Sequence, residues 1–176
     1  MRKTITLTII KKVALAVGFV VATIVLPQIF HSFGMAGTVF LPMHIPVLFV
    51  GFLFGPLYGA IVGAVSPMIS TYLTGMPAEF PVMPIMVCEL ATYGLVAGLL
   101  SKTKLPKIVS LVITMLAGRV SYAVAYCIMK FVLFPTVTEK ISPVNAFITG
   151  IPGMLIQLVL VTGVLMYIKK RGKQNA

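Results

Sequence analysis

MPIMVCELATYGLVAGLLSKTKLPK, residues 83–107, carries the main features of this chain in one piece. Its first part, residues 83–100, is long and apolar enough to cross the ~30 Å hydrocarbon core of a bilayer. One carboxylate, Glu89, interrupts it. The stretch ends in a turn with three lysines, which are costly at the centre of a bilayer. The sequence therefore predicts a membrane helix with an internal charge and a basic end.

The rest of the chain has the same character. Of its 176 residues, 59% are hydrophobic and 10% are charged, and the mean hydropathy is +1.09. A soluble domain needs about a quarter of its residues charged to cover its surface. We therefore expect an integral membrane protein made of a single domain, residues 1–176, without linkers or low-complexity segments.

Polar and turn-forming residues divide the apolar sequence into six predicted transmembrane helices, which would pack as one compact all-α bundle. Two of them are short for a ~30 Å core and contain Pro46 and Pro67, so we expect both to be kinked or partly irregular. The first apolar run lacks an A-x-A cleavage site, so we expect no cleavable signal peptide. The six predicted segments are 9–27, 41–54, 60–73, 83–100, 108–133 and 144–168.

Basic residues predict the orientation of this bundle. The net charge is +11, and because basic loops are retained in the cytoplasm, membrane topology accounts for it without a nucleic acid partner. Six spans put both termini on one side, which we predict to be cytoplasmic together with the loop at 101–107. The clustered basic residues are Arg2, Lys3, Lys11, Lys12, Lys102, Lys104, Lys107, Lys169, Lys170, Arg171 and Lys173.

Two ionisable residues fall inside predicted spans. Glu89 lies roughly 10 Å from the outer end of its helix, and Arg119 lies near the middle of the next one. A charge inside the membrane is costly and marks a functional site by default. The two side chains could contact a bound solute, or they could form an ion pair that only neutralises both charges. The sequence leaves both alternatives open.

Aromatic and amide side chains accompany these charges. Tyr93 is spaced to share a helix face with Glu89. Tyr122 and Tyr126 share a face of the next helix, where Arg119 also lies. Aromatic walls with a few fixed donors and acceptors suit a small polar solute, although each tyrosine alone could equally anchor or pack a helix. The predicted substrate-binding residues are His44, Glu89, Tyr93, Arg119, Tyr122, Tyr126, Asn145 and Gln157.

No catalytic group can be assembled from the sequence. His44 lacks a recognisable nucleophile or metal partner, and Cys88 and Cys127 lack metal-ligand spacing. The chain contains no phosphate-binding loop, no HExxH motif and no nucleophile elbow. We therefore expect no enzymatic activity, no cofactor and no metal, and any uphill transport would draw its energy from a partner protein.

Small residues recur every four positions in the first predicted helix, at Ala14, Gly18 and Ala22. Such a row lets another helix approach closely. The approaching helix could belong to this chain or to a partner protein.

Six spans, this row and the run FGPLYGAIVGA at residues 54–64 resemble the substrate-binding S component of energy-coupling factor (ECF) vitamin transporters, over essentially the whole chain. In that family the small-residue row docks on a transmembrane coupling protein, the T component, which two cytoplasmic ATPases drive. The resemblance implies a multi-pass protein of a bacterial cell membrane. It also implies that a solute is captured from outside among helices four to six, and that the S component topples to release it inside.

The run LPMHIP at residues 41–46 resembles the branch that includes pantothenate carriers. Arg119 would suit a vitamin with a carboxylate, because a guanidinium binds that group bidentately. Glu89 argues against a purely anionic site and leaves pyridoxine-like, pyrimidine or other vitamins open. The chain departs from the family at Gly18, where an alanine is usual, and at Ser66-Pro67, where many members carry an aspartate.

The sequence thus predicts the substrate-binding subunit of an ECF-type importer, with pantothenate as the first candidate solute. The alternative is a self-contained small secondary transporter or channel, which would need an internal repeat or a set of ion-coupling carboxylates.

Overall fold

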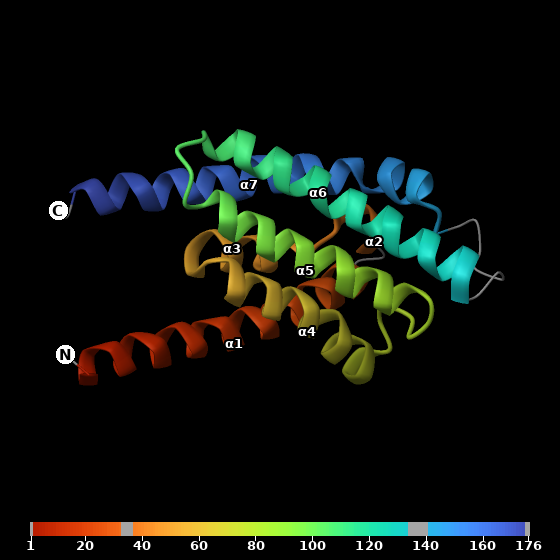
Figure 1. Cartoon of the computed structure of the whole chain (residues 1–176), viewed down its shortest axis with the longest axis horizontal. Coiled ribbons are helices and arrows are strands. Elements are labelled where there is room, and N and C mark those ends of the chain that lie inside the picture. Colours follow the sequence, from red (N-terminus) through yellow and green to blue (C-terminus); the bar gives the residue numbers. More distant parts are fainter. Residues whose placement is uncertain (1, 33–36, 134–140, 175–176) are drawn as a thin grey trace.

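A computed structural model describes residues 2–32, 37–133 and 141–174 of the chain, and the regular structure in these ranges is helical (Figure 1). Six helices of eleven residues or more account for most of it, with one short helix and one π-helical turn beside them. Their bounds are α1 Arg2–Ser32, α2 Gly37–Phe40, α3 His44–Phe54, α4 Pro56–Thr74, α5 Val82–Leu100, α6 Lys107–Ile128, η1 Met129–Leu133 and α7 Pro143–Gln174.

Five segments of the described residues are long and apolar enough to cross a membrane, so the predicted all-helical architecture is confirmed, whereas the predicted six spans are not. The helix α3 is apolar as well, but at 11 residues it is too short to be a candidate span. At ~1.5 Å per residue it rises roughly 16 Å, about half of a ~30 Å core. The candidate spans are Lys12–Phe30, Pro56–Thr74, Val82–Leu100, Lys107–Val132 and Pro143–Ile168.

Several prolines lie inside helices. The first helix was predicted to end at Pro27, but α1 continues to Ser32 with Pro27 buried inside it. A proline costs one backbone hydrogen bond, a loss that membrane helices tolerate. Pro46 is the third residue of α3, where the backbone N–H is unpaired in any helix, and Pro67 lies within the continuous helix α4.

Glycines set the boundaries of α4. Gly55, between α3 and α4, has φ 100° and ψ 179°, a conformation that side chains strongly disfavour. Pro56 follows as the first helical residue, with its φ already suited to a helix. At the other end Gly75 caps the helix in the left-handed conformation, with φ 71°, and its N–H donates to the Thr71 carbonyl.

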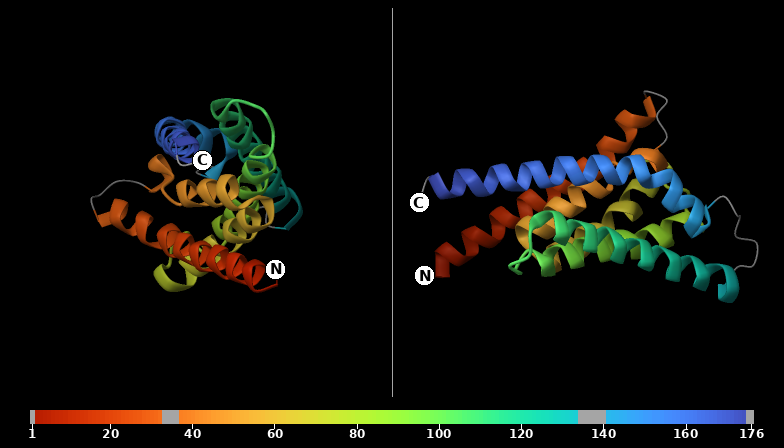
Figure 2. Two further views of the ribbon diagram at one scale, coloured as in Figure 1. Left: turned by 90° about the vertical axis from the view of Figure 1, so that its left-hand side faces the viewer. Right: turned by 90° about the horizontal axis from the view of Figure 1, so that it is seen from above.

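A row of glycines lets α4 and α5 pack backbone to backbone. A Cβ on Gly59 or on Gly94 would overlap the backbone of the other residue, and a Cβ on Gly63 would overlap the backbone of Leu90. Gly59 and Gly63 of the run at 54–64 therefore serve contacts within the chain. Seen end-on, α3 lies in the middle of the molecule, packed against α1, α4, α5 and α7 (Figure 2).

Both ends of the chain lie at the same end of the molecule (Figures 1 and 2). The turn at Gly55 and the connection between α5 and α6, which carries Lys102 and Lys104, lie there as well. We call this the basic end. The connection between α4 and α5, with Glu79, lies at the opposite end. The fold thus gathers at one end the segments whose charges predicted the orientation.

Candidate functional site

Three buried ionisable side chains from three helices meet inside the bundle. Glu89 of α5 holds one carboxylate oxygen, Oε1, 2.9 Å from Nη1 of Arg119 on α6. The other carboxylate oxygen, Oε2, lies 3.6 Å from Nε2 of His44, the first residue of α3. Glu89 and His44 are 2% and 1% exposed and Arg119 is 10% exposed, so water does not screen these charges. We call these residues, together with Tyr93, the charged cluster.

Tyr93 closes one side of the charged cluster. It lies one turn after Glu89 on α5, is fully buried, and meets the His44 ring edge-on, with 5.0 Å between centroids and 82° between planes. Two glycines make room for these large groups. A Cβ on Gly118 would overlap the Tyr93 ring, and one on Gly150 would lie 2.6 Å from Nη2 of Arg119. The second contact places α7 beside the guanidinium.

Gln157 of α7 ties the turn before α3 to the bundle. Its Nε2 donates to the Leu41 carbonyl at 3.3 Å, and the backbone N–H of His44 donates to the same oxygen at 3.1 Å. Leu41 has φ 49°, a conformation that is uncommon outside glycine. Two donors on one carbonyl hold this turn in place, and with it the position of His44.

Several polar atoms in this region are buried without a hydrogen-bond partner in the described part of the chain. They include Nδ1 of His44, the hydroxyl of Tyr93, Nε and Nη2 of Arg119, and Oε1 of Gln157. More than nine in ten buried polar groups in proteins have a partner, so a concentration of exceptions calls for an explanation. Donors and an acceptor thus converge here with unused hydrogen-bonding capacity.

Three further predicted residues lie elsewhere. Tyr122 and Tyr126 are buried in a separate cluster with Ile85, and the Tyr122 hydroxyl donates to the Ile141 carbonyl at 2.8 Å. The hydroxyl of Tyr126 is buried without a hydrogen-bond partner among the described residues. Asn145 is exposed on the first turn of α7. The structure therefore buries His44, Glu89, Tyr93, Arg119 and Gln157 but leaves Asn145 at the surface.

Leu41, Gly118 and Gly150 also contact this region, although none of them was predicted from the sequence. A glycine inside a helix often marks a close approach, and this signal was present at Gly118 and Gly150. No sequence signal points to the Leu41 carbonyl. In the described ranges, no group of three or more His, Cys, Asp and Glu side chains could hold a metal ion.

A cavity of about 460 Å³ lies at the basic end, away from the charged cluster. Its lining residues come from the end of α3, the connection between α5 and α6, and the last turns of the span in α7. None of the predicted substrate-binding residues lines it.

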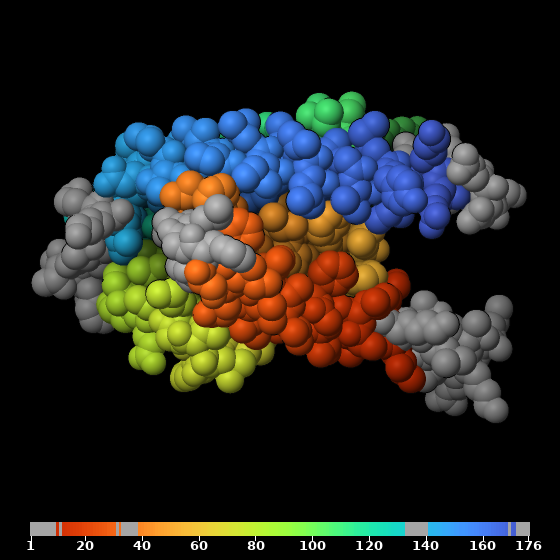
Figure 3. All heavy atoms as spheres, turned by 180° about the vertical axis from the view of Figure 1, so that it is seen from behind, coloured from red at the N-terminus to blue at the C-terminus, as the bar shows by residue number. Residues whose placement is uncertain are grey.

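The small-residue row of α1 lies at the surface for much of its length. Ala14 and Gly18 are exposed, and a Cβ on Gly18 would meet nothing within 4 Å. Ala16, on another face, is buried against the core instead. Figure 3 shows α1 along the outside of the molecule. Among the described residues, no neighbouring helix packs closely on Gly18, whereas Ala22 is half-buried.

A protein-family model, described as ECF transporter, substrate-specific component, matches residues 8–169. A search of curated proteins and a search of solved structures each found no match.

Proposed function

The chain belongs to the family of substrate-specific components of ECF transporters, and from this membership we propose that it captures a water-soluble vitamin from outside the cell. A T component and two cytoplasmic ATPases, as in that family, would then drive release inside. The substrate would bind at the charged cluster and at Gln157.

The unsatisfied polar atoms carry this proposal. A structural ion pair needs only Glu89 and Arg119, at 2.9 Å. It does not need a tyrosine hydroxyl, two further guanidinium nitrogens and an amide oxygen buried beside it without partners. Each such atom costs about 1–3 kcal/mol when buried unpaired. A polar solute that enters the cluster would satisfy them and recover much of that cost.

The chemistry of these atoms favours a solute with a carboxylate and neutral polar groups. Arg119 has Nε and Nη2 free to grip a carboxylate, while Glu89 can remain beside His44. The hydroxyl of Tyr93 and the amide oxygen of Gln157 suit hydroxyl and amide groups. Pantothenate combines a carboxylate, an amide and hydroxyls, and it is our first candidate; pyridoxine-like and pyrimidine vitamins are the next.

The position of the cluster supports access from the end opposite the basic end. His44 begins α3, and Glu89 lies in the first half of α5, counted from the connection that carries Glu79. The positive-inside rule places the basic end in the cytoplasm. The shorter route from the cluster to water then leads outward.

Native mass spectrometry of the purified protein tests the proposal. We expect one small molecule to co-purify, and pantothenate to bind with higher affinity than the other vitamins. Tyr93→Phe should lower the affinity for the bound solute about fivefold to tenfold, since it removes one hydrogen bond of roughly 1 kcal/mol.

The same substitution should leave the thermal unfolding temperature of the solute-free protein nearly unchanged, because the hydroxyl has no partner to lose. Tyr58→Phe, which alters a partly buried tyrosine of α4 outside the charged cluster, is the matched control and should change neither property. Unchanged affinity in both variants would place the solute away from Tyr93 and contradict the proposal.

A further inference from the structure

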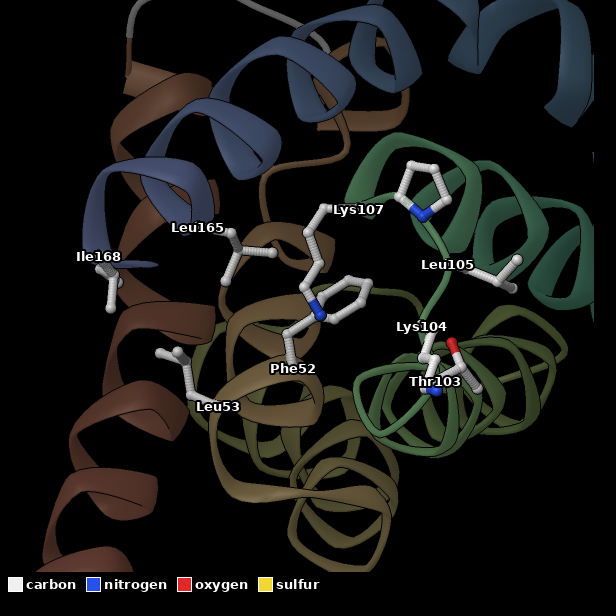
Figure 4. A pocket seen from close by; sticks show the side chains of 9 residues that line it. Phe52, Leu53, Thr103, Lys104, Leu105, Lys107, Leu165 and Ile168 are labelled. Carbon is white, nitrogen blue, oxygen red and sulfur yellow. The ribbon is translucent and has the colours of Figure 1, made fainter. Parts of the chain in front are cut away.

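The cavity at the basic end combines apolar walls with two lysines. Figure 4 shows the end of α3 and the side chains of α7 on one side of it, and the connection between α5 and α6 on the other. Its volume of about 460 Å³ falls within the range of ligand pockets, roughly 300–1,000 Å³. The lining residues are Phe52, Leu53, Thr103, Lys104, Leu105, Pro106, Lys107, Leu165 and Ile168.

The cavity lies at the level where apolar helices give way to polar sequence. Lys107 is the first residue of one candidate span, and Ile168 is the last residue of another. Leu53 is the penultimate residue of α3. In a bilayer this level corresponds to the boundary between acyl chains and headgroups. Leu53 and Ile168 are exposed, so the apolar part of the cavity continues onto the outer surface of the bundle.

The charge around the cavity is positive. Lys104 is exposed on its rim, and Lys107 extends over the Phe52 ring, with Nζ 5.9 Å from the centroid and 3.4 Å from the Ser101 carbonyl. Lys107 also begins α6, so the positive end of that helix dipole points the same way. The chain has only three acidic side chains, Glu79, Glu89 and Glu139, and neither of the two that the structure describes, Glu79 and Glu89, lines this cavity.

We propose that this cavity binds an anionic phospholipid of the surrounding membrane. The phosphate lies between Lys104 and Lys107, and an acyl chain runs along Leu53, Leu165 and Ile168. Basic pockets between transmembrane helices on the cytoplasmic side suit acidic headgroups in this way. A soluble phosphate would use the two lysines alone, whereas a lipid also covers the exposed apolar wall. The apolar wall therefore favours the lipid over the soluble anion.

Binding of defined lipids to the purified full chain tests the inference. The protein is titrated with dioleoyl-phosphatidylglycerol or dioleoyl-phosphatidylcholine in detergent, and native mass spectrometry counts the bound lipids. We expect one phosphatidylglycerol to bind more tightly than phosphatidylcholine. Because each lysine near an anionic lipid is worth about 1 kcal/mol, Lys104→Gln should weaken phosphatidylglycerol binding about fivefold. The double variant Lys104→Gln/Lys107→Gln should abolish the preference.

The matched control is Lys12→Gln/Lys170→Gln, which removes two charges near the same end but outside the cavity. This control should prefer phosphatidylglycerol over phosphatidylcholine to within about twofold of the unaltered protein. Lys107 holds the Ser101 carbonyl, so the double variant is checked by thermal unfolding. If the double variant does not fold, the affinity of the single variant Lys104→Gln for phosphatidylglycerol tests the inference.

Three outcomes would overturn the inference. The first is equal binding of both lipids by the unaltered protein, which is also the result expected if a partner's helix fills the cavity instead. The second is an equal loss of affinity for phosphatidylglycerol in the control and in the variants of Lys104 and Lys107. The third is competition by inorganic phosphate at the lipid's own affinity, which would identify a site for soluble anions.

Discussion

Glu89 and Arg119 neutralise each other at 2.9 Å inside a bundle that is almost entirely apolar. Removal of one partner from a buried pair leaves the other charge uncompensated, which typically costs about 3–5 kcal/mol. The pair also has a neighbour in His44, whose imidazole forms a further ion pair with Glu89 when it carries a proton. At the scale of single residues, stability and the proposed solute binding would therefore depend on the same side chains.

Substitution of both charged residues should separate the effect on stability from the effect on solute binding. We expect Arg119→Gln to lower the free energy of unfolding by about 3 kcal/mol, because Glu89 is left buried and unpaired. The double variant Glu89→Gln/Arg119→Gln should recover most of that loss, since two amides replace the two charges at similar volume, while solute affinity stays low. Chemical unfolding in one detergent measures the stabilities. Additive losses in the double variant would contradict energetic coupling of the pair.

At the scale of elements, the glycines of α4 and α5 act as spacers that set how closely these helices approach. Gly94 has no room for a Cβ, because the backbone of Gly59 occupies that place. Gly18 of α1 has open space at the same position. The two glycines therefore predict opposite responses to the same substitution.

Gly94→Ala should destabilise the protein by several kcal/mol, because α4 and α5 must move apart. Gly18→Ala should be neutral or stabilising by up to about 1 kcal/mol, since alanine has the higher helix propensity. Thermal unfolding of both variants, compared with the unaltered chain, measures the difference. A stable Gly94→Ala protein would show that α4 and α5 can separate without loss.

For side chains larger than alanine in the small-residue row of α1, we expect a different result. Ala14→Leu/Gly18→Leu should abolish vitamin uptake by the assembled transporter, because the added side chains prevent close approach of the T component. Solute binding by the isolated subunit should remain within about twofold, since neither residue touches the charged cluster. Ala91→Leu, on the packed helix α5, is the contrasting variant, and it should lower the stability of the protein as well. Equal loss of uptake and binding in the α1 variant would argue against partner docking.

At the scale of the whole molecule, the fold gathers the basic loop at 101–106 and both chain ends at one end, and it leaves the Glu79 connection at the other. The charged cluster lies between them, inside the helices, while the cavity lined by Lys104 and Lys107 lies at the basic end. The proposed solute site and the proposed lipid site are therefore at different depths.

Cysteine accessibility tests the orientation. In a chain carrying Cys88→Ser and Cys127→Ser, Glu79→Cys should react with a membrane-impermeant maleimide in intact cells, because that connection faces outward in the proposed topology. Lys104→Cys should react only after the membrane is permeabilised. Both positions are exposed in the structure, so each should be reactive once accessible. Labelling of Lys104→Cys in intact cells would reverse the proposed orientation.

Much of this organisation could be read from the sequence. Apolar length and the positions of basic residues predicted the helical membrane architecture, since insertion depends on transfer free energies that add up along each segment. Helix ends were less predictable at Pro27 and at the start of α3, because neighbouring helices and local turns compensate for lost backbone hydrogen bonds. The intramembrane charges at Glu89 and Arg119 were visible, but not the choice between pairing and solute contact.

Only the tertiary structure decided which side chains meet. Gln157 reaches the carbonyl of Leu41 across 116 positions of sequence, and His44 approaches Glu89 from another helix. Such contacts depend on the rotation and depth of each helix, which the close packing at Gly59, Gly94, and Gly118 determines. The hydropathy of a segment does not depend on how its helix is rotated about its axis, so hydropathy cannot predict that rotation. The sequence alone therefore determined that the chain is a membrane bundle with charges inside it, and packing determined where those charges point.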